Sequence, residues 1–315
     1  MKKREFTVKS GYDGLEIACA EYLPECAESG GAGEAAASNV KGAVQLVHGM
    51  CEYKERYEPF AKFLTDHGFA VFASDHRGHG NSVKSAEDLG YFGDKKGEAI
   101  VDDTALVTDE IKRLYPDLPL TLFGHSMGSL VVRAYLKKYE EKIDKLIVCG
   151  SPSKNALAGA GLALNKAISL FKGARHRSAL MAKLSTGDGD DNFPGEGKNA
   201  WLTRDRSIVD KYNADGKCNF TFTCNGFSNL LHLVKNVYKK SNYPVKRPDL
   251  PVFFIAGADD PVIINKEKWL AAQDFLKKAG YKNVSGKLYE GMRHEILNER
   301  GKEEVYNDVL TFLCK

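Results

Sequence analysis

The chain lacks the features that mark membrane-spanning and nucleic-acid-binding proteins. Its apolar runs are no longer than single strands, whereas a transmembrane helix needs about 20 apolar residues. Its 45 basic and 42 acidic residues leave a net charge of only +3, which does not indicate a nucleic-acid surface or an anionic-membrane stripe. With 43% hydrophobic residues, the composition is that of an ordinary globular protein. We therefore expect no nucleic-acid partner and no integral membrane association.

Regularly spaced cysteines are also missing. The seven cysteines are an odd number and are scattered along the chain, which predicts reduced thiols and a cytoplasmic protein. The basic start, Met1–Arg4, leads into an alternating strand at Glu5–Lys9 rather than into the apolar core of a signal peptide. Cys218 and Cys224 have no matching second pair for zinc. The stretch from Asp188 lacks the glycine and glutamate of a calcium loop, so we expect no metal and no cofactor.

Strand-like and helix-like segments alternate along much of the chain. The expected strands are Glu5–Lys9, Leu15–Tyr22, Ala43–Val47, Ala70–Ser74, Leu120–Phe123, Lys145–Cys149, Pro251–Gly257 and Ser285–Tyr289. Such alternation predicts an α/β fold with a mostly parallel sheet covered by helices on both faces. In such sheets the active site lies beyond the carboxyl ends of the strands.

The alternation stops between residues 151 and 243. This region enters after one core strand and leaves before the next, so it is predicted to be a cap inserted over the active site. The core would then comprise residues 1–150 and 244–315. Residues 26–41 are rich in Ala, Gly and Ser and are expected to form a mobile surface loop without chemistry.

One pentapeptide, Gly124–Gly128 (GHSMG), carries the clearest chemical signal. It lies between the strand-like Leu120–Phe123 and a helical pattern at Met127–Tyr139. Glycines two positions before and after the serine allow a sharp strand-to-helix turn without side-chain clashes. Such a turn strains Ser126 and exposes its hydroxyl at the helix N-terminus. The setting predicts a nucleophilic serine.

A serine hydroxyl needs a base, and the base needs an orienting acid. Two later strands are followed by candidates: Asp259 and Asp260 come after the first, and His294 comes after the second. Serine, aspartate and histidine in this order are the chain order of α/β-hydrolases, which differs from the orders in the chymotrypsin and subtilisin folds.

Five segments together resemble α/β-hydrolases of the monoacylglycerol lipase and lysophospholipase type, often grouped with serine aminopeptidases. They are VHGM (Val47–Met50), DHRGHGNS (Asp75–Ser82), GHSMG (Gly124–Gly128), GADDPV (Gly257–Val262) and GMRHEILNE (Gly291–Glu299). They occur in the expected order and span most of the chain outside the middle region. The resemblance implies an α/β-hydrolase fold and a cofactor-free catalytic machinery.

The resemblance also implies a role for each site residue. Ser126 would be the nucleophile and His294 its base. The acid of the family stands three residues after the strand-ending glycine, which matches Asp260. Asp259 is the alternative, or else a turn-capping residue.

Acyl transfer further needs N–H donors for the developing oxyanion. By resemblance these are the backbone N–H groups of Met127 and Met50. The segment Asp75–Gly80 is expected to be a structural loop that supports the site. Cys51, beside the oxyanion loop, is expected to be buried rather than reactive.

The other histidines are expected to have structural roles. His125 is adjacent to the nucleophile, and adjacent residues on such a turn point apart, so we expect it to pack or to form hydrogen bonds. The remaining candidates have no aspartate suitably placed after a strand; they are His48, His76, His79 and His232.

These observations favour a serine hydrolase of carboxylic esters whose partner is a small, lipid-like ester of the monoacylglycerol or lysophospholipid type. An aminopeptidase of the proline-iminopeptidase kind is the alternative, with Asp188–Asp191 or Glu196 holding a substrate amine. A non-catalytic ligand receptor on the same fold is a third hypothesis. Apolar residues of the inserted region could line an acyl channel, although packing of the cap explains them equally; they are Leu157, Leu162, Leu164, Ile168, Leu170, Trp201, Phe220, Phe222 and Phe227.

Overall fold

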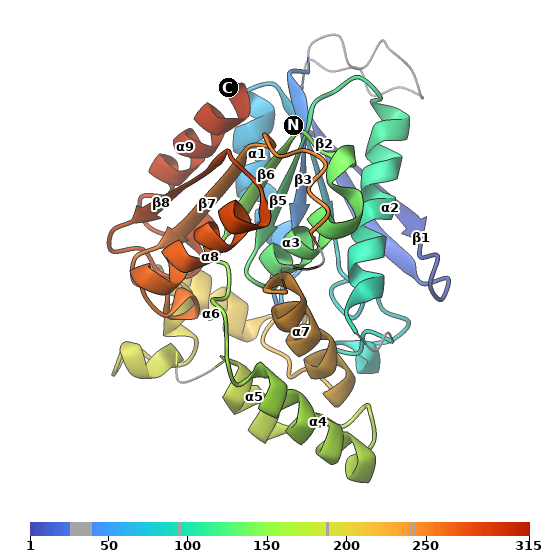
Figure 1. The fold of residues 1–315 in the computed structure, drawn as a ribbon, viewed down its shortest axis with the longest axis vertical. Helices are drawn as coiled ribbons and strands as arrows, with labels where there is room; N and C mark the ends of the chain where they lie inside the picture. Colours follow the sequence, from blue (N-terminus) through green and yellow to red (C-terminus); the bar gives the residue numbers. More distant parts are fainter. Residues whose placement is uncertain (26–39, 94–95, 187–188, 240, 242) are drawn as a thin grey trace.

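The computed structural model describes residues 1–25, 40–93, 96–186, 189–239, 241 and 243–315 (Figure 1). The loop predicted at residues 26–41 lies almost wholly outside the described residues.

The strands form one eight-stranded sheet in the order β1-β2-β4-β3-β5-β6-β7-β8. All neighbouring pairs from β4 to β8 are parallel, and β1 and β2 run antiparallel at one edge. The strands are β1 (Lys2–Lys9), β2 (Glu16–Leu23), β3 (Gly42–Val47), β4 (Phe69–Ser74), β5 (Leu120–His125), β6 (Lys145–Cys149), β7 (Val252–Gly257) and β8 (Val284–Tyr289). Every residue of β3, β4 and β5 is buried, as expected for central strands covered on both faces. The predicted mostly parallel sheet is confirmed.

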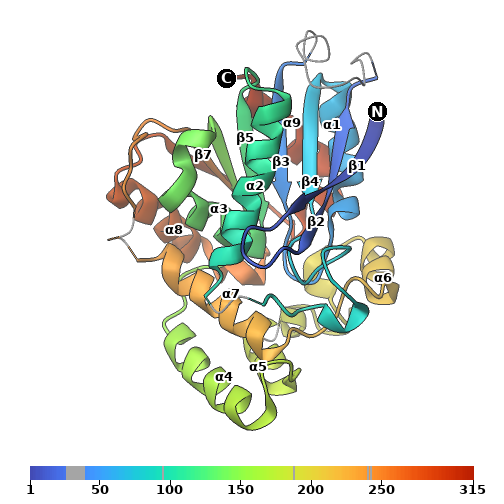
Figure 2. The ribbon, with the colours of Figure 1, turned by 90° about the vertical axis from the view of Figure 1, so that its right-hand side faces the viewer.

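Helices cover both faces of this sheet (Figure 2). The helices α1 (Glu58–Asp66) and α9 (Lys302–Cys314) pack on one face, where Phe60 and Val309 share an apolar cluster with Phe123. The helices α2 (Glu98–Leu114), α3 (Met127–Tyr139) and α8 (Lys266–Ala279) pack on the other face. Helix α3 begins and ends at the residues predicted from the sequence.

Between β6 and β7 the chain forms α4 (Ala158–Lys172), α5 (Ala179–Thr186), α6 (Arg206–Ala214) and α7 (Cys224–Val237). We call residues 151–243 the insertion. Helix α7 packs against both α3 of the core and α4 of the insertion. Figures 1 and 2 place α4 and α5 at the end of the molecule opposite α9.

The helices within the described ranges include none that combines the length and the apolar character needed to cross a membrane.

Candidate active site

Ser126 lies on a sharp turn between β5 and α3. Its backbone has φ +54° and ψ −119°, a strained conformation for a non-glycine residue. The turn is packed tightly, because a Cβ on Gly128 would lie 2.1 Å from the carbonyl oxygen of Val47. A Cβ on Gly124 would lie 2.5 Å from the carbonyl oxygen of Gly128. Both glycines are therefore required by close contact, and Ser126 is left partly exposed between buried neighbours.

Asp260 and His294 form a buried pair. The Nδ1 of His294 lies 2.9 Å from Oδ2 of Asp260, and each residue is 2% exposed. The other carboxylate oxygen of Asp260 accepts the backbone N–H of Val262 at 2.8 Å. Asp259 is exposed, and it contributes only its backbone N–H, to the carbonyl of Met292. Of the two candidate acids, the structure brings Asp260 to the histidine.

Backbone contacts between strand ends join the serine to this pair. The N–H of Ser126 donates to the carbonyl oxygen of Cys149 at 2.9 Å. The next residue, Gly150, lies directly beside the pair: a Cβ on it would be 3.2 Å from Cε1 of His294 and 3.4 Å from Oδ2 of Asp260. The carboxyl ends of β5, β7 and β8 thus gather all three candidates at one edge of the sheet, beside the end of β6.

The loop after β3 lies against Ser126. A Cβ on Gly49 would lie 3.0 Å from Cβ of Ser126, and Met50 follows directly. Met127 is the first residue of α3. The backbones of both predicted oxyanion donors, Met50 and Met127, therefore lie next to Ser126.

A buried carboxylate, Glu52, fixes this loop, and sequence reasoning missed it. Glu52 accepts the N–H of Gly49 at 2.5 Å, the hydroxyl of Tyr57 at 2.9 Å and Nη1 of Arg56 at 2.7 Å. The imidazole Nδ1 of His125 lies 3.1 Å from the same carboxylate. Burial alone would raise the pKa of Glu52, but the hydrogen bond from His125 and the charge of Arg56 hold that pKa well below its usual value. Because a guanidinium, a backbone N–H and a hydroxyl all donate to it, Glu52 acts as an acceptor and is an anion.

Arg56 ties the same loop to the histidine loop. Its guanidinium donates to both oxygens of Glu295, at 2.8 Å and 2.7 Å. Glu295 follows His294, so the chain of charges Glu52, Arg56 and Glu295 links the loop after β3 to the loop that carries His294. A usable signal was present in the sequence. Glu52 and Arg56 are four residues apart and come soon after the segment Val47–Met50, and Glu295 directly follows His294.

The segment Asp75–Gly80 supports the site, as predicted. The N–H of His76 donates to Nε2 of His48 at 2.9 Å, and Nε2 of His76 lies 3.0 Å from the carbonyl oxygen of His48. Asp75 accepts the backbone N–H of Lys54 at 2.8 Å and its ammonium at 3.1 Å. Burial lowers the pKa of His48 to about 3, which keeps that ring neutral.

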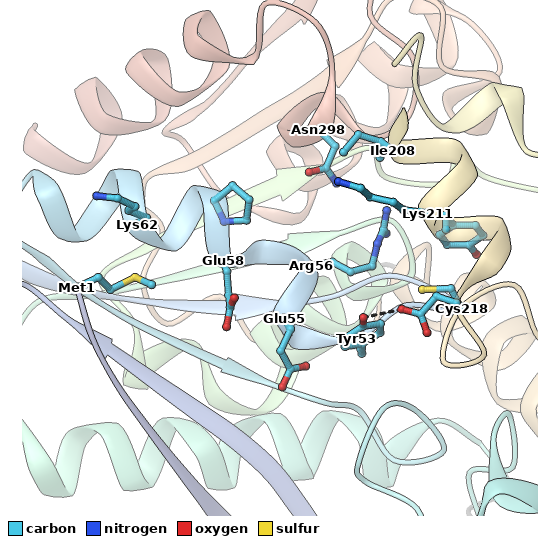
Figure 3. Close-up of a pocket in the computed structure, with 13 residues that line it drawn as sticks. Met1, Tyr53, Glu55, Arg56, Glu58, Lys62, Ile208, Lys211, Cys218 and Asn298 are labelled. Atoms are coloured by element: carbon cyan, nitrogen blue, oxygen red, sulfur yellow. Dashed lines mark hydrogen bonds between the residues drawn. The ribbon is translucent and has the colours of Figure 1, made fainter. Parts of the chain in front are cut away.

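A pocket of about 510 Å³ opens behind Arg56, between α1 of the core and α6 of the insertion (Figure 3). Its lining includes Tyr53, whose hydroxyl donates to Asp215 at 2.6 Å, and Lys211 of α6. Neither Ser126 nor His294 lines it. This pocket is therefore separate from Ser126 and His294; Arg56, which lines it, also contacts Glu295 beside His294.

The apolar candidates of the insertion differ in their exposure, and Leu162 and Ile168 are half-buried. Leu157, Leu164 and Leu170 are 72%, 37% and 76% exposed, so the expectation that they line an acyl channel is wrong for these three. Their side of α4 faces outward because the opposite side packs on α7, where Asn165 donates to the carbonyl of Cys224 at 2.7 Å.

Two aromatic candidates lie at the site. The ring of Trp201 is centred 5.0 Å from that of His294. The carbonyl of Phe220 accepts the thiol of Cys51, next to Met50 in sequence, at 2.9 Å. By contrast, Phe222 and Phe227 are fully buried.

Two further expectations concern metals and cysteines. Within the part of the chain that the structure describes, no three His, Cys, Asp or Glu side chains gather as a metal site. Cys51 is buried, and burial raises the pKa of its thiol well above the usual value, so it is protonated and unreactive.

Comparison with known proteins gives relatives over most of the chain. A monoacylglycerol lipase of Mycolicibacterium smegmatis is 26% identical over 275 residues, 87% of this chain and 88% of the relative. The phospholipase YtpA of Bacillus subtilis is 23% identical over 85% of this chain and 93% of its own length.

Solved structures of esterases and lipases are also similar to this chain. A thermostable carboxyl esterase from Bacillus coagulans in complex with glycerol is 27% identical, with a TM-score of 0.85 over 99% of this chain and 98% of that one. A soluble variant of monoglyceride lipase from Saccharomyces cerevisiae in complex with a substrate analogue has a TM-score of 0.72 over 98% of this chain and 94% of that one; at 20% identity it supports the fold alone.

The family model described as serine aminopeptidase, S33, matches residues 38–301 of the chain. This match includes every segment that carries the resemblance, from Val47 to Glu299. Because it spans far more than half of the sequence, and because the sheet, the turn at Ser126 and the order of the strands are those of the fold, the protein belongs to this family of α/β-hydrolases.

Proposed function

We propose that the protein is a serine hydrolase that cleaves carboxylic esters through an acyl-enzyme on Ser126. The observation that carries the proposal is the buried pair of His294 and Asp260, 2.9 Å apart, at the strand edge where the strained Ser126 is partly exposed. A nucleophile, a base and an orienting acid are the minimal set for this chemistry.

In this mechanism the hydroxyl of Ser126 attacks the acyl carbonyl while Nε2 of His294 accepts its proton. Asp260 accepts the Nδ1–H of His294, which fixes the tautomer and stabilises the imidazolium that forms. The N–H groups of Met50 and Met127 bind the oxyanion. His294 then returns the proton to the leaving alcohol, and a water activated by the same histidine releases the acid.

The proposed substrate is a monoacyl ester with a small polar head, of the monoacylglycerol or lysophospholipid type. The names of the relatives support it, and so does the esterase structure that holds glycerol. Trp201 gives an apolar surface beside His294, and the ring of Phe220 packs against His79 of the supporting loop. We propose that the insertion, residues 151–243, is a cap that selects the acyl chain.

The aminopeptidase hypothesis needs a carboxylate that can hold a substrate amine. Glu196 is engaged by both terminal nitrogens of Arg293, at 2.9 Å and 2.7 Å. Asp190 accepts the backbone N–H of Asn199 at 2.9 Å. These engagements favour the ester hypothesis. Asp188 lies outside the described residues.

A cytoplasmic location also stays our prediction. The described cysteines are free thiols, which supports a reducing compartment.

A fluorophosphonate probe tests the nucleophile, because it reacts with activated serines. Wild-type protein should be labelled and Ser126→Ala should not. A matched pair of octanoyl substrates, an aryl ester and an aryl amide, then tests the bond that is cleaved. Equal labelling of the variant, or faster cleavage of the amide, would contradict the proposal, and labelling without turnover of any ester would favour the receptor.

A further inference from the structure

His125 lies between two oxygen acceptors. Its Nδ1 is 3.1 Å from Oε1 of Glu52, and its Nε2 is 3.2 Å from the backbone carbonyl oxygen of His294. The residue is buried, so water does not take the place of either contact. The carboxylate of Glu52 is ionised and a peptide carbonyl has no hydrogen, so neither oxygen can donate.

A neutral imidazole has one N–H and one lone pair. In the neutral state of His125, one ring nitrogen would therefore turn a lone pair toward an oxygen, and a buried acceptor would lose its donor. Such unpaired buried groups are rare in native structures because each costs free energy. Only the doubly protonated ring satisfies both contacts.

We propose that His125 is held as an imidazolium and is a positioning residue that fixes the backbone of His294, with Glu52 as its counter-ion. This proposal rests on the proposed function for its kinetic consequence, because it assigns His294 as the base. His125 does not contact the reacting atoms in this arrangement. It links the carboxylate of Glu52, which holds the oxyanion loop, to the backbone carbonyl of His294.

The charges around the ring support this state. Glu52, from the loop after β3, faces it directly, and Glu295, from the loop after β8, adds a second negative charge. Arg56 lies between those two carboxylates. The ring of Tyr57 is 6.5 Å away and that of His294 is 4.7 Å away. Burial lowers the pKa of His125, but the hydrogen bond and charge of Glu52 outweigh burial and raise the pKa overall.

His48 provides an internal contrast under the same rule. Its Nδ1 lies 2.8 Å from the carbonyl oxygen of Gly49, whereas its Nε2 accepts the N–H of His76 at 2.9 Å. One donor and one acceptor are satisfied by a neutral ring, and the pKa of His48 is lowered to about 3. The geometry thus assigns opposite charge states to two buried histidines in the same site.

The sign of the pH dependence follows from the raised pKa. The cation of His125 is fully present below the ordinary histidine pKa, and it is lost as the pH rises through the raised folded value. Deprotonation breaks one of the two contacts and releases the backbone of His294. Since misplacing a catalytic group by about 1 Å can cost about 100-fold in rate, kcat should fall on the alkaline side.

Nitrogen-15 histidine NMR on the wild-type protein reads the charge state without any turnover. At neutral pH, His125 should show two protonated nitrogens and His48 one, with resonances assigned through His125→Gln and His48→Gln. Glu52→Gln should convert His125 to the neutral form that keeps only Nε2–H, because the new amide can donate to Nδ1. A singly protonated His125 at neutral pH in the wild type overturns the proposal, whether or not the protein hydrolyses esters.

Kinetics then test the positioning role. His125→Gln should lower kcat by about 10- to 100-fold, leave KM within about twofold and abolish the alkaline fall in kcat. An equal loss at every pH with the alkaline fall retained overturns the role, and so does wild-type kinetics in the variant. The matched control is His232→Gln on α7, whose ring forms a hydrogen bond within its own helix to the carbonyl of Ser228 and which should behave as wild type. Fluorophosphonate labelling of Ser126 separates a failure of this proposal from a failure of the proposed function.

Discussion

The core and the insertion differ in which side chains they bury and which they expose. On the core side, the carboxylates of Glu52 and Glu295 are buried and are paired with Arg56 between the loops that follow β3 and β8. On the insertion side, the outward face of α4 is apolar, and Leu170 and Phe171 are 76% and 91% exposed. Fixed polar contacts position the reacting groups. Among the described residues, the exposed face of α4 makes no such contacts, so we expect the chemistry to depend on the core, and we propose that substrate choice depends on other parts of the insertion, such as Trp201 beside His294.

The largest expected effect tests the core directly. Asp260→Asn keeps the size of the acid but favours the wrong tautomer of His294, so kcat should fall by about four orders of magnitude. Asp259→Asn is the matched control, because that side chain is exposed and the change should leave kcat nearly normal. Steady-state hydrolysis of an aryl octanoate measures both. The reverse pattern would transfer the acid role to Asp259.

The next effect concerns the buried charges. Arg56→Leu leaves Glu52 and Glu295 buried without their shared partner, and breaking such a pair costs about 3–5 kcal/mol. Urea unfolding should report a loss of this size. The control, Arg206→Leu, removes an exposed pair with Asp210 and should change the free energy of unfolding by less than about 1 kcal/mol. Equal effects of the two changes would show that the buried charges do not hold the loops.

A smaller effect tests whether the insertion selects the acyl chain. Burial of each methylene gains about 0.8 kcal/mol, so kcat/KM should rise about fourfold per methylene from acetyl to at least octanoyl esters until the channel is filled. Phe220→Gln should flatten this rise and leave acetyl ester turnover largely intact. A series of aryl esters of graded chain length measures it. A preference of the wild type for acetyl over every longer ester would remove the lipid hypothesis.

The smallest effect lies on the outer face of α4. Phe171→Ser exchanges a side chain that is almost fully exposed, so the free energy of unfolding should change by no more than about 0.5 kcal/mol. Acetyl ester turnover should also be unchanged. Urea unfolding beside Phe222→Ser, which empties a fully buried site and should cost about 3–5 kcal/mol, provides the contrast. A large loss from Phe171→Ser would mean that this face packs against part of the protein.

Sequence patterns were sufficient for the elements that build the site. The turn at Ser126 was predictable because two glycines flank the serine where a strand pattern meets a helix pattern. Both glycines are needed, because a Cβ on either would come within 3 Å of a backbone oxygen. The strands were predictable because their apolar runs are short and bounded. Asp260 was preferred over Asp259 only by resemblance, and burial now separates them.

The parts that could not be predicted depend on contacts distant in sequence. Glu52 meets His125 across 73 residues, and Arg56 meets Glu295 across 239. The spacing of apolar and polar residues along the chain does not predict pairs so far apart in the sequence. For the aliphatic residues of α4 the sequence left two alternatives open, an acyl channel and packing of the cap, and here the buried side of the helix instead carries Asn165 against α7.

Trapping the covalent intermediate is the most direct test of the central claim, that Ser126 carries the acyl group. The protein is mixed with an aryl octanoate, quenched in acid within milliseconds, and analysed by intact mass and peptide mapping. The account predicts one octanoyl group on the peptide that contains Ser126, and none in Ser126→Ala. Octanoyl on another residue, or turnover by Ser126→Ala at the wild-type rate, would contradict it.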